Sequence, residues 1–280
     1  MNFDLNENKP VIVLLGAGCM GTAIVRKIAA GKIILLGDIS EENLNKVSHE
    51  LRYSGYEVYT QIVDAMDQES VRKFAQKAQS LGKVMYFIDT AGASPNQASP
   101  EHIVKLDLIS TAIAIDEFSK VIERGGSGLV VSSQTGYMMD FSPEIENQFA
   151  LTPTEQLSEL DFVKNEAIKD PGIAYISAKR CNQLRVRTAA STSWGKRGAR
   201  INSISPGIIV TPLAYDEFNA AGEGYQKMIE ASPARRVGTA DEIAEAASFL
   251  LNASFITGID LLIDGGVIAA MKSGQYSLGE

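Results

Sequence analysis

The sequence predicts an α/β fold, a doubly wound parallel sheet of about seven strands with helices on both faces. Three observations support this prediction. Short apolar runs alternate with amphipathic stretches, the apolar runs are continuous, and no linker rich in proline, glycine or serine divides the chain. Continuous apolar strands separated by helices are typical of parallel sheets buried on both faces. We therefore expect a single domain over residues 1–280, built with right-handed crossovers.

The alternation runs along nearly the whole chain. Expected strands lie at 11–15, 32–38, 57–64 and 83–89, and they are separated by expected helices at 20–30, 41–54 and 68–81. The second half continues with a long helix near 100–124, a strand at 128–133, a helix at about 173–194, a strand at 199–204, a helix at 240–252 and a strand at 260–264. Strands that alternate with helices in this way indicate repeated strand–helix–strand units.

Two segments break the alternation, residues 137–172 and 211–235. Each follows the end of a strand, which is where open α/β sheets bind ligands. We expect a helical insertion at 137–172 and a substrate lid at 211–235, because loops of this length in a compact domain are usually functional. One interpretation of the insertion is that it forms a wall of the substrate pocket. The alternative is that it is a hairpin that contacts another subunit or a solvent-exposed loop without a function of its own. Its pattern predicts one or two acidic amphipathic helices that bury Phe149, Leu151, Leu157, Leu160, Phe162 and Val163.

Composition places the chain among soluble globular proteins. Of its 280 residues, 45% are hydrophobic and 21% charged, a balance that can bury a sizeable core. No run of about 18 apolar residues suggests a membrane span, and the first ten residues are polar and acidic. The two cysteines, Cys19 and Cys181, have neither a disulfide framework nor the spacing of a zinc site. We expect a cytoplasmic protein that does not bind metal or membranes.

Charge argues against nucleic acid as a partner. The formal net charge is -8, and most of it comes from residues 137–172, where eight acids face two lysines for a local charge of -6. A nucleic-acid binder needs a basic stripe, whereas the basic clusters of this chain are short, as at 196–200. The acidic segment is interpreted as a solvated face.

A glycine loop follows the first expected strand. Residues 16–21 read GAGCMG and place Gly16, Gly18 and Gly21 in the GxGxxG pattern, followed by an expected helix. This pattern provides a tight turn, close backbone approach to a pyrophosphate and a helix N-terminus that attracts an anion. Asp38 ends the next strand, where its carboxylate can accept the ribose hydroxyls of NAD and repel the 2′-phosphate of NADP. A single-domain Rossmann fold that binds NAD is the prediction; a glycine loop without a ligand is the alternative.

The chain resembles the short-chain dehydrogenase/reductase family over almost its whole length. The motifs that carry the resemblance appear in family order: the glycine loop, Asp38, VDAMD (63–67), DTAG (89–92), VVSSQTG (130–136), YISAK (175–179), SPGIIVT (205–211), RRVGTADEIAEAASFLL (235–251) and TGIDLLIDGG (257–266). The resemblance departs at 137–172, because Ser133 and Tyr175 are 42 positions apart where most members have a much shorter connection.

The resemblance implies a catalytic set of Ser133, Tyr175 and Lys179. Tyr175 would be the general acid/base, Lys179 its electrostatic partner, and Ser133 the hydrogen-bond donor to the substrate oxygen, with Ser132 as the alternative. A phenol is a weak base at neutral pH, but a lysine four positions away on a helix lies beside it and favours the phenolate. A tyrosine and lysine at this spacing alone are more often a surface pair, and only the neighbouring motifs favour the catalytic interpretation.

The same resemblance implies the cofactor contacts. The adenine would lie near Asp64 and Ala65, the adenosine ribose against the strand end at Ala91 to Ala93, and the carboxamide near Ile209 and Thr211. The full expected set is Gly16, Gly18, Met20, Gly21, Asp38, Asp64, Ala65, Ala91, Gly92, Ala93, Tyr175, Lys179, Pro206, Gly207, Ile209 and Thr211.

Three departures from the family pattern concern the site. The glycine loop is one residue shorter than TGxxxGxG, DTAG replaces NNAG, and Asp107 stands where the family often has an asparagine that carries a water relay to the lysine. Asp107 could bind a water of that relay or pair directly with Lys179, and both alternatives are kept.

These patterns together predict an NAD-dependent oxidoreductase that moves a hydride between the nicotinamide and a secondary alcohol or ketone. The insertion resembles that of some bacterial hydroxysteroid dehydrogenases, which favours a bulky, apolar small molecule as substrate. An NAD-binding regulator or redox sensor without turnover is the alternative, and dehydration or epimerisation on the same fold is a third possibility. Family members are commonly homo-tetramers or homo-dimers built through the helices near 100–124 and 173–194, and we expect the same here.

Overall fold

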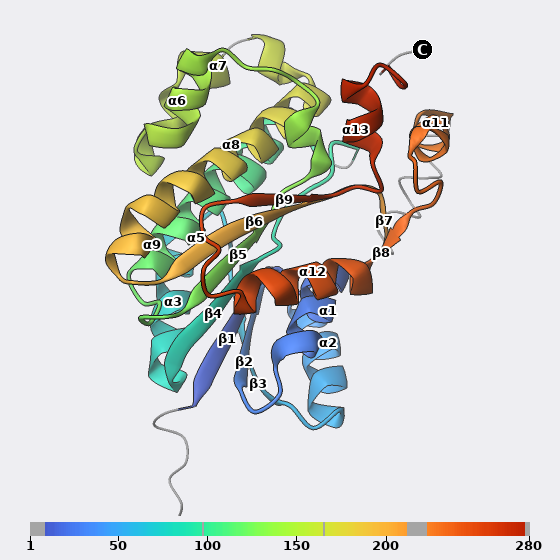
Figure 1. Cartoon of the computed structure of the whole chain (residues 1–280). Coiled ribbons are helices and arrows are strands. Elements are labelled where there is room, and N and C mark those ends of the chain that lie inside the picture. The colour runs from blue at the N-terminus through green and yellow to red at the C-terminus, as the bar shows by residue number, and fades with distance from the viewer. Residues whose placement is uncertain (1–8, 97, 165, 212–222, 278–280) are drawn as a thin grey trace, which may run out of the picture.

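The computed structural model describes residues 9–96, 98–164, 166–211 and 223–277. It confirms the expected α/β fold, with a sheet of seven strands in the order β3-β2-β1-β4-β5-β6-β9, all parallel to their neighbours (Figure 1). The strands are β1 (Pro10–Leu15), β2 (Ile33–Asp38), β3 (Glu57–Ile62), β4 (Lys83–Asp89), β5 (Ser127–Val131), β6 (Arg200–Pro206) and β9 (Asp260–Ile263). The order reverses between β1 and β4, so a crevice opens at the carboxyl ends of these two strands.

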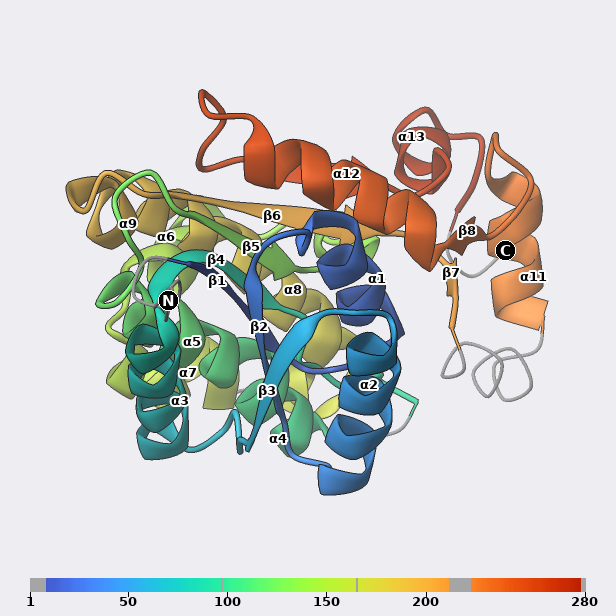
Figure 2. The same ribbon diagram turned by 90° about the horizontal axis from the view of Figure 1, so that it is seen from below.

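Helices cover both faces of the sheet (Figures 1 and 2). One layer contains α1 (Cys19–Ile28), α2 (Glu41–Tyr53) and α12 (Ala240–Asn252), and the other contains α3 (Gln68–Leu81), α5 (Ser110–Ser119), α8 (Pro171–Ser191) and α9 (Ser193–Lys196). Each layer encloses its own apolar core, because successive residues of a buried strand point to opposite faces. Polar side chains cap the starts of α2, α3, α8 and α12, and at α12 Thr239 and Glu242 form a reciprocal capping box.

The long helix expected near 100–124 is divided into three parts. These are α4 (Pro100–Ile103), a π-helical segment η1 (Val104–Ile109) and α5. The hydroxyls of Ser110 and Thr111 donate to the carbonyls of Leu106 and Asp107 one turn earlier. π-Helical turns are rare and occur most often at functional sites. Here the turn contains Asp107, which lies fully buried against α8.

The insertion folds into several short helical segments rather than one or two helices. They are η2 (Gln134–Tyr137), α6 (Pro143–Leu151), η3 (Thr154–Glu159), α7 (Asp161–Lys164) and η4 (Glu166–Lys169). Phe149 and Leu157 are buried as expected, and Phe149 makes edge contacts with Phe141 and Phe162. The prediction for Leu151 was wrong, because its side chain is 67% exposed. Leu151 lies two positions after Phe149 on the helix, so its side chain points away from the buried face that contains Phe149.

The insertion builds a third core against α8 and η1. Phe149, Leu157 and Ile168 pack there with Ala178 and Leu184 of α8. Polar bonds tie the same segments together, because Arg185 of α8 donates to the carbonyls of Phe149 and Thr152 and to the hydroxyl of Thr154. The insertion therefore packs on one face of α8.

The C-terminal part adds elements that the sequence did not predict. A two-stranded parallel pair, β7 (Ile209–Val210) and β8 (Gly238–Thr239), joins the strand end of β6 to α12, and α11 (Glu223–Ala231) and α13 (Val267–Lys272) lie nearby (Figure 2). Most of the expected lid, residues 212–222, lies outside the described residues. Among the residues described, no helix is both long enough and apolar enough to span a membrane.

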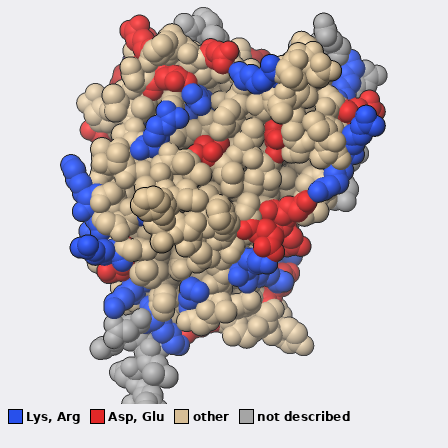
Figure 3. Space-filling model, viewed as in Figure 1, with Lys and Arg blue, Asp and Glu red and all other residues tan. Residues whose placement is uncertain are grey.

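Charged side chains are dispersed over the face seen in Figure 3. Lysines and arginines form small separate groups, acidic groups lie among them, and most of the middle is occupied by uncharged residues. On this face, the described residues form no continuous basic band of the kind that tracks a phosphate backbone.

We predict that the third core contributes strongly to stability. Phe149→Ala should lower the free energy of unfolding by about 3–5 kcal/mol, because a fully buried ring leaves a cavity. Leu151→Ala on the same helix is the matched control and should change it by less than about 1 kcal/mol, since that side chain is 67% exposed. Urea unfolding of both variants measures the difference. Equal losses would contradict a buried role for the insertion.

Candidate active site

The glycine loop joins β1 to α1 at the crevice between β1 and β4. Gly16 has a φ of 85°, a conformation that L side chains rarely adopt. A Cβ there would lie 2.6 Å from the backbone nitrogen of Ala91, so the ends of the two strands approach as closely as a glycine permits. A Cβ at Gly21 would lie 2.7 Å from Leu14 Cδ1 and 2.7 Å from Thr90 Oγ1. Gly16 and Gly21 are therefore required by packing.

Gly18 has a different environment. A Cβ at this position would meet no atom within 4 Å, so its surroundings are open. Gly18 is also the N-cap of α1, and no side chain caps that helix or places an acid in its first turn. The uncapped N–H groups and the helix dipole form a site suited to an anion such as a pyrophosphate.

A cavity of about 300 Å³ continues from this loop along the strand ends. It brings together residues that are far apart in sequence, and its lining includes these expected cofactor residues: Gly16, Gly18, Asp38, Asp64, Ala65, Ala91 and Gly92. Met20 packs against the neighbouring core and Ala93 lies on the loop beyond Gly92. The described lining contains no lysine or arginine.

Asp38 is held in place at the end of β2. Its Oδ2 accepts hydrogen bonds from the Ala17 N–H at 2.8 Å and from Asn43 at 3.1 Å, and its Oδ1 accepts one from the Ser40 N–H at 2.9 Å. A carboxylate offers about four acceptor positions, so capacity for a further donor remains. Sequence reasoning missed Asn43, whose amide also donates to the Ala17 carbonyl and so connects Asp38 to the glycine loop.

Residues 89–92, DTAG, contact the glycine loop from the end of β4. The family pattern NNAG has two asparagine amides where this chain has Asp89 and Thr90. The Thr90 hydroxyl donates to the Gly16 carbonyl at 2.6 Å. The buried Asp89 carboxylate accepts the Ala91 N–H at 3.1 Å. Burial raises the pKa of Asp89 to about 7, and the hydrogen bond from Ala91 offsets part of that rise.

Tyr175 and Lys179 lie one turn apart near the start of α8. The side chain of Asp170 caps this helix by accepting the Ile173 N–H. The Lys179 ammonium is 5.1 Å from the centre of the Tyr175 ring, so the pair is in contact. It also forms a buried ion pair with Asp107, at 2.7 Å from Oδ1. Burial alone would lower the pKa of Lys179, but the Asp107 carboxylate, together with the negative charges of Tyr175 and Asp89, holds that pKa above its usual value.

Of the two geometries considered for Asp107, the structure contains the direct pair with Lys179. The carboxylate contacts Lys179 without an intervening group, and its Oδ2 accepts the Ala93 N–H at 3.0 Å. A Cβ at Gly92 would lie 2.6 Å from Asp107 Oδ1, so this close approach requires the glycine. Asp107 thus joins Lys179 to the loop that carries the expected ribose contacts.

Ser132 and Ser133 occupy different roles at the end of β5. The Ser132 hydroxyl donates to the Lys179 carbonyl at 2.9 Å, which ties β5 to α8. The Ser133 hydroxyl instead accepts a hydrogen bond from the Thr135 N–H at 3.2 Å. Because the hydroxyl is the acceptor there, that bond does not use its proton. The turn after Ser133 packs directly on α8, because a Cβ at Gly136 would lie 3.1 Å from the Arg180 nitrogen.

The segment expected to hold the carboxamide leaves β6 through Pro206 and Gly207. The Gly207 N–H donates to the Ile263 carbonyl at 2.8 Å, and Ile209 pairs with Gly238 between β7 and β8. Thr211 is the last described residue before the gap.

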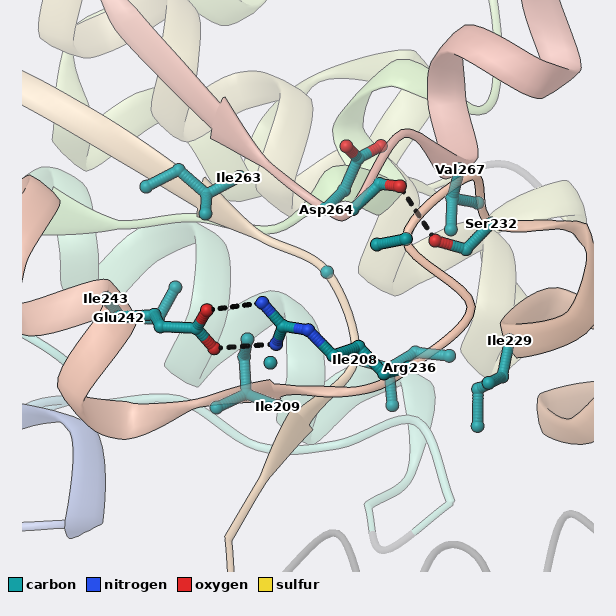
Figure 4. Close-up of a pocket in the computed structure, with 14 residues that line it drawn as sticks. Ile208, Ile209, Ile229, Ser232, Arg236, Glu242, Ile243, Ile263, Asp264 and Val267 are labelled. Carbon is teal, nitrogen blue, oxygen red and sulfur yellow. Dashed lines mark hydrogen bonds and ion pairs between the residues drawn. The ribbon is translucent and has the colours of Figure 1, made fainter.

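Figure 4 shows a second cavity, of about 180 Å³, beside this segment. Its lining includes five isoleucines, among them Ile209, and Arg236, whose guanidinium forms two hydrogen bonds with Glu242. None of Ser133, Tyr175 and Lys179 lines it. The Ile209 side chain anchors its strand there, and we assign this cavity no catalytic role.

The fold and this site define a dinucleotide-binding α/β protein. Comparison with family models identifies the family. The model described as "short chain dehydrogenase" matches residues 9–142, and the model described as "Enoyl-(Acyl carrier protein) reductase" matches residues 159–268. The chain belongs to the short-chain dehydrogenase/reductase family and is an oxidoreductase of that family. Its members generally bind nicotinamide cofactors and act on small molecules.

Individual relatives agree with this assignment. The chain is 39% identical over 270 residues to the short-chain dehydrogenase/reductase bsc3 of Alternaria brassicicola, covering 95% of this chain and 98% of that one. It is 26% identical over 281 residues to the NADH-dependent L-xylulose reductase of Ambrosiozyma monospora, covering 91% and 93%. Among solved structures, a short-chain dehydrogenase/reductase from Serratia marcescens has the same fold, with a TM-score of 0.73 at 20% identity over 94% of this chain and 98% of that one.

We predict that Gly18 and Gly21 respond oppositely to substitution. Gly18→Asp should keep or raise the unfolding temperature, because aspartate is a good N-cap and has room, yet weaken NADH binding at least about tenfold through charge repulsion. Gly21→Ala should lower the unfolding temperature, because its Cβ would overlap Leu14 and Thr90. Thermal unfolding and fluorescence titration with NADH measure both effects. Unweakened binding in Gly18→Asp would refute the pyrophosphate site.

Proposed function

We propose that the protein is an NAD-dependent oxidoreductase that acts on the CH–OH group of a secondary alcohol or the corresponding ketone. The observation that carries the proposal is the contact of Tyr175 with the Lys179 ammonium, which in turn lies close to Gly92 in the lining of the cavity: a Cβ at Gly92 would lie 3.3 Å from Lys179 Nζ. A phenol beside a buried ammonium can exchange a proton with a substrate oxygen. The single-domain organisation, with a helical insertion and a substrate lid, is part of the same proposal.

The bound nicotinamide would supply or accept the hydride at the substrate carbon. Tyr175 then gives a proton to the substrate oxygen in reduction and takes it in oxidation. Ser133 donates a hydrogen bond to that oxygen while charge develops on it. Lys179 stabilises the phenolate and holds the nicotinamide ribose. Gly18 and the N-terminus of α1 hold the pyrophosphate, and Ile209 and Thr211 orient the carboxamide.

Asp38 supports NAD rather than NADP as the cofactor. Its carboxylate stands at the wall of the cavity, where a 2′-phosphate would meet a negative charge, and the described lining offers no lysine or arginine to neutralise it. The relative from Ambrosiozyma monospora is named as NADH-dependent, which agrees with this choice.

The apolar residues at the start of the insertion favour a bulky, apolar substrate that is hydroxysteroid-like in character. Met138 and Met139 follow the Ser133 turn directly and are partly exposed. Methionine side chains are apolar and adaptable, so they suit the wall of a pocket for a large apolar molecule. The expected lid contains further apolar residues, Leu213, Tyr215 and Phe218, which lie outside the described residues.

The alternative of a regulator or redox sensor is not favoured, because both named relatives are dehydrogenases or reductases. Dehydration or epimerisation would be recognised by turnover without a net change in NADH absorbance. A cytoplasmic location and a homo-dimeric or homo-tetrameric state belong to the proposal as further expectations.

Tyr175→Phe tests the mechanism. We expect kcat to fall by a factor of about 10²–10⁴ on any active secondary alcohol or ketone, because the proton donor and acceptor is removed. NADH affinity should change less than about twofold, since the ring remains. Tyr56→Phe, which removes a hydroxyl that contacts the Arg26 carbonyl far from α8, is the control and should retain activity. Steady-state assays on a panel of such substrates give the answer, and a fully active Tyr175→Phe would exclude this mechanism.

Asp38→Ala tests the cofactor preference. The ratio of kcat/KM with NAD(H) to that with NADP(H) should fall at least about tenfold, because one repulsive charge and one ribose acceptor are lost together. The ratio is the informative quantity, since loss of the bonds to Ala17 and Ser40 lowers both values. A ratio equal to that of the wild type would remove Asp38 from cofactor selection.

A further inference from the structure

The Lys179 ammonium is surrounded by more negative charge than a general-base tyrosine requires. Lys179, Asp107 and Asp89 are all buried, with exposed fractions of 4%, 0% and 2%. Asp107 contacts the ammonium at 2.7 Å, and Asp89 lies close enough for its charge to act on Lys179 as well. These two carboxyls and Tyr175 are the titratable groups that act on Lys179, from η1, β4 and α8 respectively.

Asp107 is fixed from several directions, so the ion pair is a built feature of the site. Its Oδ2 accepts the Ala93 N–H, and its backbone carbonyl accepts hydrogen bonds from Asn182 at 2.9 Å and Thr111 at 3.2 Å. The Asp107 carboxylate cannot turn toward solvent without breaking its bonds to the Ala93 N–H and to the Lys179 ammonium.

A fixed carboxylate changes what the lysine does to the phenol. An ammonium alone favours phenolate, and a carboxylate in contact with that ammonium cancels much of its field on a third group nearby. We infer that Asp107 is a positioning residue that keeps Tyr175 in its protonated form to a higher pH than Lys179 alone would allow, and so widens the pH range in which Tyr175 can donate a proton to a substrate carbonyl. The inference rests on the proposed function of Tyr175.

The reaction step balances with the groups already named. In reduction the substrate C=O π bond breaks, its carbon gains the hydride and its oxygen gains the Tyr175 proton, while the reduced nicotinamide is oxidised. Water then returns a proton to the Tyr175 phenolate. A phenol that has already lost its proton cannot perform this step, which is why its protonation range matters.

Asp107→Asn tests the inference without any substrate. The family's common residue at this position is asparagine, so the variant keeps the size and one acceptor oxygen. The phenolate absorbance of Tyr175 at 295 nm is obtained as the difference between each protein and its Tyr175→Phe counterpart. We expect the titration midpoint of Tyr175 to fall by about one pH unit in Asp107→Asn, which is a tenfold gain in the phenolate-to-phenol ratio at fixed pH. The descending limb of the pH profile for carbonyl reduction should move by the same amount.

Asp116→Asn is the matched control, because it removes the same charge from α5, where Asp116 contacts the Thr154 hydroxyl and not Lys179. It should leave the midpoint unchanged. An unchanged midpoint in Asp107→Asn, or an equal shift in Asp116→Asn, overturns the inference. If Asp107→Asn does not fold, the wild type alone decides: a Tyr175 midpoint below pH 7 overturns it and one above supports it. Failure of the proposed function is distinguishable, because it appears as turnover in Tyr175→Phe.

Discussion

The close approach of the ends of β1 and β4 is the constraint on which the site depends. Gly16 lies so near the backbone of Ala91 that a methyl group does not fit, and the Thr90 hydroxyl bridges the same gap. Because parallel strands end at one edge of the sheet, this contact sets the N-terminus of α1 opposite the loop at Ala91 to Ala93. The two sides of the cavity at these strand ends are thereby held at a fixed separation.

A second set of contacts surrounds Lys179. Its ammonium pairs with Asp107, and its carbonyl accepts the Ser132 hydroxyl. Asp107 also accepts the Ala93 N–H, so α8 and the loop after β4 share one carboxylate. The insertion supports this arrangement from behind through the third core and the bonds of Arg185.

The sequence was sufficient for the sheet and its helices, because continuous apolar runs and capping residues are local signals. It was insufficient where tertiary contacts decide. The π-helical turn at Asp107 depends on side chains of α8, the exposure of Leu151 depends on which face of α6 meets α8, and the short pair β7 and β8 has too few residues to produce a periodic pattern. Motif order located the residues that line the dinucleotide cavity, whereas their roles remain predictions. Asn43 carried no signal, since its importance comes only from its distance to Asp38 and Ala17.

The burial of α8 has a consequence for how the protein can vary. Between Ser177 and Val186 only Arg180 escapes full burial, and Arg180 is itself bonded to Glu146 of the insertion. Most helices of a globular domain keep one face in water, where sequence can drift at little cost. The helix that carries Tyr175 and Lys179 has almost no such face, since sheet, η1 and insertion enclose it. Variation in this chain must therefore accumulate in α2, in α12 and on the outer surface of the insertion, while α8 changes only together with its neighbours.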